Sequence, residues 1–112
     1  MNKIPFTTID WSDVEKIESR GVTGSSVSQT IEIDGLRIRK VEYLPGYLAD
    51  HWCQKGHIIY CLEGDFISEM ESGEKFTLSK GMMYIVSDHM SSHRSTTING
   101  ATLLIIDGQF LA

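Results

Sequence analysis

The sequence predicts an all-β fold in which many short strands are joined by tight turns. Two-residue turn signals recur from Asp34-Gly35 to Asn99-Gly100, at intervals typical of a β-sandwich or a β-barrel. Between these signals lie short runs rich in β-branched and aromatic residues, at 30–33, 36–44, 58–62, 66–70, 76–78, 82–86 and 101–106.

The length and charge of the chain restrict its architecture and its partners. At 112 residues it is long enough for one hydrophobic core and too short for two domains. Its net charge of −5 argues against a nucleic-acid-binding surface, which needs clustered lysine and arginine. No apolar run approaches the ~20 residues of a membrane span, and the first residues lack the apolar region of a signal peptide. We expect a single cytoplasmic domain over 1–112 that binds neither nucleic acid nor membranes.

The N-terminal part of the chain differs from the rest. Pro5 favours an extended arm over about 1–9, because proline blocks an early helix. Ser12 and Glu15 have the spacing of a capping box, which predicts a short helix over about 13–19.

A predicted loop separates this helix from the strands. The segment 21–28 is rich in glycine, serine and threonine, which is typical of a loop. The predicted domain therefore has an arm and a helix over about 1–28 and a barrel over about 29–107.

Three residues that bind transition metals, His51, Cys53 and His57, lie close together in the middle of the chain. His51 and Cys53 are two residues apart, so in a strand both side chains point to the same face. The segment 54–56 ends in a glycine, which is typical of a three-residue hairpin loop whose last residue is left-handed; such a loop makes Cys53 and His57 cross-strand neighbours. Imidazole and thiolate then converge, as a transition-metal site requires. The alternative is a set of ordinary packed residues, with the cysteine acting as a small hydrophobe.

A fourth candidate ligand lies later in the chain. A polar loop follows the run 82–86, and His93 then opens a strand that Asn99-Gly100 folds back on the next one. His93 can therefore project inward from the start of a strand. His89 lies in the middle of the loop and is expected to be solvated.

The two cysteines, Cys53 and Cys61, are not expected to form a disulfide. In the predicted hairpin Cys61 lies ~13 Å along the strand from the residue that faces Cys53, whereas a disulfide needs Cα atoms within about 7 Å. Because Cys61 shares the strand face of His57, we expect it in the barrel wall.

Arginine and tyrosine side chains are further candidates for a binding role. Arg37 and Arg39 share one face of a predicted strand, so one of them could meet an anionic ligand, although a solvated charged face is commoner. Four tyrosines could line a pocket, although buried tyrosines with satisfied hydroxyls are commoner: Tyr43, Tyr47, Tyr60 and Tyr84.

At these positions the sequence resembles the cupin superfamily. The first cupin motif reads Gly, a few residues, His-x-His, three or four residues, Glu, six residues, Gly. Here Gly46 precedes His51-x-Cys53, and His57 stands before Gly64 at the spacing of the motif.

The second cupin motif and two departures from the first complete the resemblance. Gly81 and His93 match the ends of the second motif, with Ser87 where proline is usual and one extra residue before the histidine. Cys53 stands at the second histidine position of the first motif, and His57 stands at its glutamate position.

With these departures, the sequence is similar to a narrower group, the small DHCW-motif cupin fold proteins. The similarity rests on DHCW at 50–53, KGH at 55–57 and HRS at 93–95, and it extends from about residue 4 to residue 107. It implies a single small cupin-type β-barrel, a jelly-roll-like double-stranded β-helix, with a short N-terminal helix and arm. It also implies four metal ligands: His51, Cys53, His57 and His93. No reaction is implied, because the superfamily hosts many chemistries.

Three imidazoles and one thiolate suit zinc best, and also iron, nickel or copper, rather than magnesium or calcium. Four protein ligands close a tetrahedral zinc site but leave two positions open on an octahedral ion. Two functions remain open. One is a metal-binding cupin domain that acts on or binds a small molecule; the other is a non-catalytic sensing or binding domain with a closed structural metal site. Apolar residues on both faces of several runs also predict a homodimer.

Overall fold

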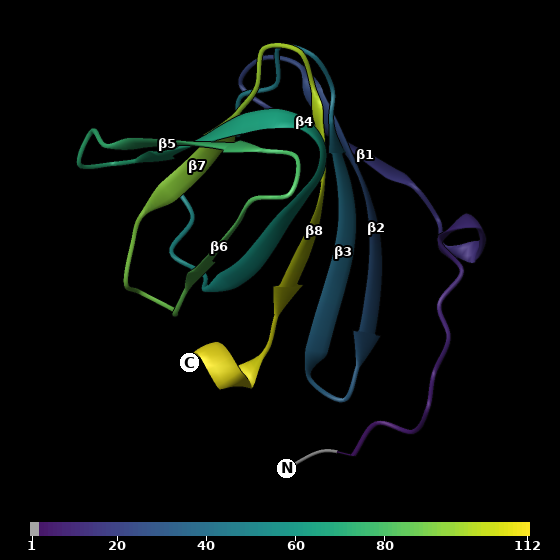
Figure 1. The fold of residues 1–112 in the computed structure, drawn as a ribbon. Coiled ribbons are helices and arrows are strands. Elements are labelled where there is room, and N and C mark those ends of the chain that lie inside the picture. Colours follow the sequence, from purple (N-terminus) through teal and green to yellow (C-terminus); the bar gives the residue numbers. More distant parts are fainter. Residues whose placement is uncertain (1–2) are drawn as a thin grey trace.

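The computed structural model describes residues 3–112, so the first two residues of the predicted arm lie outside the described residues. The chain is built from antiparallel strands, which confirms the all-β prediction (Figure 1). The two short 3-10 helices are η1 (Trp11–Asp13) and η2 (Gln109–Leu111). The strands are β1 (Ile17–Arg20), β2 (Ser25–Ile33), β3 (Leu36–Tyr43), β4 (His57–Met70), β5 (Lys75–Ser79), β6 (Met83–Val86), β7 (His93–Thr96) and β8 (Ala101–Asp107).

The long strand β4 joins two parts of the sheet. Strands run in the order β1-β2-β3-β8-β4-β5, and β6 and β7 also pair with β4. The first half of β4 pairs with β8 and β6, and its second half pairs with β5 and β7. A register shift between Cys61 and Glu63 separates the halves, and a bulge of this kind bends a strand. Figure 1 shows β4 crossing from the β2-β3-β8 side of the molecule to the side of β5 and β7.

The chain between β3 and β4 has no regular strand, yet it closes the structure. Leu48 bridges to Thr23 on one side and to Thr96 on the other, and Cys53 bridges to His93. These single bridges tie β7 back to the β1–β2 turn. The interior is therefore enclosed by one side that contains β2, β3, β8, the first half of β4 and β6, and by a second side that contains the rest of β4, β5, β7 and this connection.

Alternation along the strands separates an inner face from an outer face. In β4, His57, Ile59 and Cys61 are buried, whereas Tyr60 points outward and is exposed. The burial of Cys61 confirms its predicted place in the barrel wall. The packed core consists of Val41, Tyr43, Ile59, Cys61, Phe66, Leu78, Ala101, Leu103 and Ile105.

The N-terminal segment differs from its prediction. The helix expected over 13–19 is wrong: only a single turn, η1, forms, and 17–20 is the strand β1. Asp10 rather than Ser12 caps the turn, because its Oδ1 accepts a hydrogen bond from the Ser12 amide at 3.0 Å. Pairing of β1 with Ser25–Ser28 supplies hydrogen bonds that outweigh the local helix signal.

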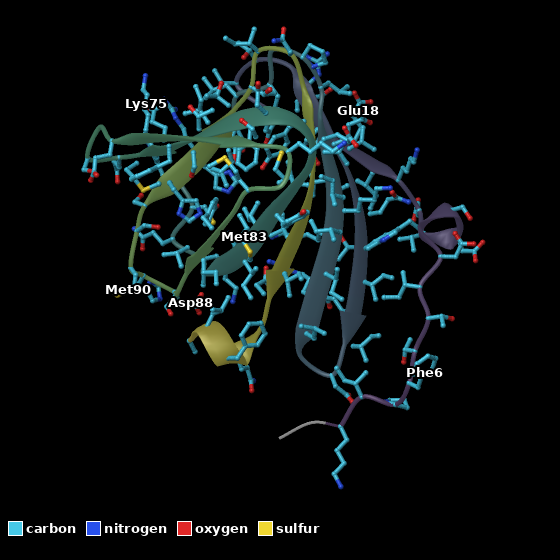
Figure 2. The ribbon with its side chains drawn as sticks, viewed as in Figure 1. Phe6, Glu18, Lys75, Met83, Asp88 and Met90 are labelled. Carbon is cyan, nitrogen blue, oxygen red and sulfur yellow. The ribbon has the colours of Figure 1, made fainter. Side chains whose placement is uncertain are left out.

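The loop predicted over 21–28 is also too long, because β2 begins at Ser25. The arm that precedes η1 contains no strand among its described residues, as predicted. Figure 2 shows Phe6 on this arm, away from the body of the barrel, and its side chain is 98% exposed. Within residues 3–112, no helix has the length and apolar character needed to cross a membrane.

Candidate metal centre

Three of the four predicted ligands lie together at one end of the interior. Cys53, His57 and His93 each place one ligand atom within 4.8 Å of the others. The Cys53 Sγ atom lies 3.5 Å from Nε2 of His57. Both histidines are buried and the cysteine is half-buried, so the cluster is largely shielded from solvent. Two nitrogens and one sulfur are donors that transition metals prefer.

Cys53 reaches this cluster through β7 and not through a hairpin. Its amide donates to the His93 carbonyl at 2.7 Å, and the His93 amide donates back to the Cys53 carbonyl at 2.9 Å. His57 pairs with Val86 of β6. The predicted cross-strand pairing of Cys53 with His57 is therefore wrong, although their side chains converge as expected. His93 opens β7 and its side chain is buried, which confirms that prediction.

Gly56 keeps the connection between Cys53 and His57 tight. It is not among the residues with positive φ, so the predicted left-handed residue at the end of the loop is wrong. A Cβ atom at Gly56 would lie 2.6 Å from the Asp88 amide nitrogen and 2.7 Å from the Val86 carbonyl oxygen. The Gly56 amide also donates to Asp88 Oδ1 at 2.5 Å. Figure 2 shows Asp88 beside η2, where its amide donates to the Leu111 carbonyl at 2.8 Å.

Asp107 is a buried carboxylate at this centre that the sequence analysis missed. Arg37 binds it with two nitrogens, with Nη2 2.9 Å from Oδ2 and Nε 3.1 Å from Oδ1. Arg39 places Nη2 3.3 Å from Oδ2. The solvated charged face expected for the two arginines is wrong, because they meet a buried carboxylate on the inner face. The missed signal is the alternation Ala101-x-Leu103-x-Ile105-x-Asp107, which puts an acid in line with core residues.

The strand register aligns Asp107 with His57. Arg37 pairs with Asp107 across β3 and β8, and Ile58 pairs with Ile106 across β4 and β8, so His57 lies beside Asp107. The distance from His57 Nδ1 to Asp107 Oδ2 is 3.5 Å, which is long for a hydrogen bond but close for a charge. The carboxylate therefore favours the tautomer with a proton on Nδ1, which leaves the Nε2 lone pair facing Cys53.

The charges and burial around His57 and Asp107 determine the protonation state of both residues. Burial lowers the pKa of His57 to about 4, and the nearby Arg39 and His93 act in the same direction. Burial alone would raise the pKa of Asp107, but the hydrogen bond and charge of Arg37, with the charge of Arg39, outweigh it and lower that pKa. At neutral pH His57 is therefore neutral, as a ligand must be, and Asp107 is ionised.

His93 offers the clearest sign that these residues fit a metal ion. Its Nδ1 atom lies 2.8 Å from Ser91 Oγ, whereas its Nε2 atom is buried without a hydrogen-bond partner. Burial lowers the pKa of His93, so the ring is neutral. The ring packs edge-on against His57 and Tyr84, with centroids 5.5 Å and 6.0 Å away. A buried and unpaired imidazole nitrogen is costly unless it meets a ligand.

His51 is not brought into this cluster. Its side chain is 77% exposed, and its Nδ1 lies 2.6 Å from Asp50 Oδ1. The rule that residues two apart share a face holds only in a continuous strand, and here a bend at 50–51 interrupts the chain before the Cys53 bridge. The role of His51 as a fourth ligand stays a prediction. His89 lies in an exposed loop with φ of 63°, as expected of a solvated residue.

A cavity of about 210 Å³ adjoins the cluster. His93 belongs to its wall, and the other lining residues come from β4, β5, β6 and the loop before β7. Of the four tyrosines considered, only Tyr84 lines it, while Tyr43 is buried and hydrogen-bonded to Ser95 Oγ at 3.0 Å. The lining consists of Ser68, Met70, Phe76, Tyr84, Ile85, Val86, Ser91 and His93.

Comparison with sequence collections gives no assignment. No protein-family model matches the chain, and no curated protein matches it significantly.

Comparison with solved structures does identify the fold. Protein NMB1881 from Neisseria meningitidis has a TM-score of 0.60 at 26% identity, over 73% of this chain and 82% of that one. A sugar phosphate isomerase of the cupin superfamily from Silicibacter pomeroyi has a TM-score of 0.74 at 14% identity, over 92% and 76%. The polyketide cyclase RemF from Streptomyces resistomycificus has a TM-score of 0.75 at 17% identity, over 96% and 88%. The chain therefore has the fold of the cupin superfamily.

Proposed function

We propose that this protein is a metal-dependent cupin that binds a small molecule at a centre held by Cys53, His57 and His93. The observation that carries the proposal is the buried, unpartnered Nε2 of His93, which belongs both to the ligand cluster and to the wall of the cavity. A polar atom in this position is satisfied by a metal ion, and the ion is then accessible from the cavity.

The donor set supports zinc first, and iron, nickel or copper as alternatives. Two neutral imidazoles and a thiolate suit all four ions and do not suit magnesium or calcium. The Asp107 carboxylate beside His57 supports the same assignment, because metal-binding histidines commonly direct their second nitrogen at such a group.

The number of ligands separates the two functions considered above. A closed structural site needs a fourth protein ligand, and His51 is the predicted candidate. His51 is exposed and directed at Asp50, which supports three protein ligands and a coordination position left for a small molecule. We therefore favour the open site over the closed structural site.

The residues at the site support binding and polarisation of a ligand more than proton abstraction. A metal ion in an open position polarises a bound carbonyl or activates water. No carboxylate is among the residues that line the cavity. Burial raises the pKa of Tyr84, so its hydroxyl stays protonated and serves as a hydrogen-bond donor rather than as a base.

The activities printed for the structural neighbours do not define a substrate for this chain. One neighbour is described as a sugar phosphate isomerase and another as a polyketide cyclase, at 14% and 17% identity. At such identities the likeness concerns the fold, and function depends on the site.

Elemental analysis of protein purified without a nickel column tests the proposal. We expect one transition-metal ion per chain, lost in Cys53→Ser and His93→Ala and retained in His51→Ala. The cobalt-substituted protein should change its visible spectrum on addition of azide. Absence of metal from the wild type would contradict the proposal. A spectrum insensitive to azide, with metal loss in His51→Ala, would support the closed structural site instead.

We further propose that the protein is a homodimer that pairs through the outer face of the sheet. One row of this face carries five isoleucines across five neighbouring strands, paired in register: Ile31, Ile38, Ile106, Ile58 and Ile85. The adjoining row contains Leu104, Tyr60 and Met83. A continuous apolar face of this kind typically marks an interface. A second copy fits it, because an isologous contact places one apolar face against the same face of the partner.

A further inference from the structure

The cavity beside the metal centre contains three polar atoms without partners. They are Ser68 Oγ, Tyr84 Oη and His93 Nε2, and all three are buried. Burial raises the pKa of the Tyr84 hydroxyl, and the Ser68 hydroxyl lies close enough to oppose that rise, yet the two groups make no hydrogen bond of good geometry. Buried hydroxyls in native proteins almost always have a hydrogen-bond partner. With His93 Nε2 bound to the metal ion, the two hydroxyls remain unsatisfied, and they point to a ligand with a polar atom beside them.

The rest of the cavity wall is apolar and carries no charge. The apolar residues Met70, Phe76, Ile85 and Val86 belong to this wall. No lysine, arginine, aspartate or glutamate is among the lining residues, and burial keeps His93 neutral. The lining itself offers no cation to a phosphate or carboxylate group, so such a group could pair only with the metal ion.

The volume of the cavity accommodates about one ring between its walls, and the cavity opens to solvent beside Phe76, which is 52% exposed. Its volume is about 210 Å³, and an apolar protein cavity of about 150 Å³ is known to hold benzene. There is room for a six-membered ring with one or two small substituents, and little more. Drug-sized ligands occupy larger pockets of about 300–1,000 Å³.

We infer that the ligand is a small, uncharged, largely apolar molecule of about one ring that carries a carbonyl or hydroxyl oxygen. The oxygen accepts hydrogen bonds from the Ser68 and Tyr84 hydroxyls, and the apolar body packs against Met70 and Phe76. This inference rests on the proposed function, because the same oxygen lies on the His93 side of the cavity, where the metal is bound. It makes sugar phosphates and other anions poor ligands for the metal-free site, because the lining supplies no cation.

Titrations with four probes test this inference on the zinc-loaded and the metal-free protein, followed by the methyl NMR signals of Met70 and Val86. The probes are acetophenone, which has a neutral ring and a carbonyl; toluene, which lacks the oxygen; benzoate; and glucose 6-phosphate. In the metal-free protein we expect acetophenone to shift both signals and to bind at least tenfold more tightly than either anion. Tyr84→Phe should weaken acetophenone about three- to tenfold, as loss of one hydrogen bond does, and leave toluene unchanged. The control Tyr60→Phe alters a tyrosine on the outer face and should change neither.

The outcomes separate this inference from the proposed function. If the protein holds one zinc per chain but benzoate or glucose 6-phosphate binds the metal-free form as well as acetophenone does, the ligand class is wrong and the metal site stands. The same holds if no probe shifts the signals at millimolar concentration. If no metal binds but the affinity for acetophenone still depends on the Tyr84 hydroxyl, the ligand class stands and the metal proposal fails.

Discussion

The Oδ2 atom of Asp107 lies 3.5 Å from Nδ1 of His57, while Nε2 of the same ring lies 3.5 Å from Cys53 Sγ. The imidazole is thus placed between a carboxylate and a thiol, with each nitrogen directed at a different partner. Because Arg37 and Arg39 hold the carboxylate in place, the orientation of His57 depends on β3 and β8 as well as on its own strand. The strands that pair beside the metal centre therefore determine its geometry.

Asp107→Asn should weaken metal binding. The amide keeps the shape of the side chain but removes the charge that favours a proton on Nδ1 of His57. Replacement of such a partner typically lowers metal affinity about 10- to 100-fold. Competition with a zinc chelator measures this change. The matched control is Glu63→Gln, which neutralises an exposed carboxylate paired with Lys80 and should leave zinc affinity unchanged. Equal affinity of Asp107→Asn and wild type would contradict the positioning role.

The stability of the metal-free protein should fall between about pH 6.5 and pH 4. The pKa of His57 is lowered to about 4 in the folded state, against about 6.5 in an unfolded chain. As the pH falls, the unfolded chain therefore takes up a proton at this histidine before the folded chain does. The free energy of unfolding decreases by about 3 kcal/mol as a result, relative to its value above pH 6.5. Urea unfolding at pH 7 and pH 4.5 measures the loss. The loss of stability should be smaller in His57→Gln than in His89→Gln, and an equal loss in both variants would refute its assignment to His57.

Gly56→Ala should disturb the metal centre through the backbone. The new Cβ would meet backbone atoms of the 86–88 segment at 2.6–2.7 Å, closer than a Cβ atom approaches such atoms, so residue 56 must move away and displace its neighbour His57. We expect a loss of about 1–3 kcal/mol in the free energy of unfolding, together with weaker zinc binding. Gly73→Ala is the control, because its Cβ meets no atom within 4 Å but its φ of 105° is strained. It should lose stability and keep zinc affinity; if Gly56→Ala also keeps zinc affinity, the spacing argument fails.

The sequence predicted the fold and three members of the centre for physical reasons that survive folding. Turn residues and β-branched runs are local signals, and they correctly indicated β7 and β8. The turn signal at Glu63-Gly64 was wrong, because β4 continues through it as one strand with a bulge. The convergence of Cys53, His57 and His93 followed from their positions in the resemblance and from the expectation that His93 opens a strand. These signals require no knowledge of which strands pair.

What the sequence could not provide depends on pairing between distant strands. The partner of Cys53 is His93 and not His57, because a loop of three residues does not by itself decide which strand lies alongside. The inward orientation of Arg37 and Arg39 depends on Asp107, seventy and sixty-eight residues away. The short strand β1 formed against a helix signal because β2 was available to pair with it. In each instance a tertiary contact outweighed a local preference.

The apolar outer face predicts a homodimer that a single charge should dissociate. Met83 is 50% exposed in β6 and pairs in register with Tyr60, which is 39% exposed in β4. Light scattering at micromolar concentration should give twice the mass of the chain for the wild type. Met83→Lys should give the mass of one chain, because an unpaired charge within an apolar interface must be desolvated. Ile98→Lys is the control, since Ile98 is exposed in the turn between β7 and β8 and lies outside this face. A monomeric wild type would end the dimer proposal, and a dimer that persists in Met83→Lys would place the interface elsewhere.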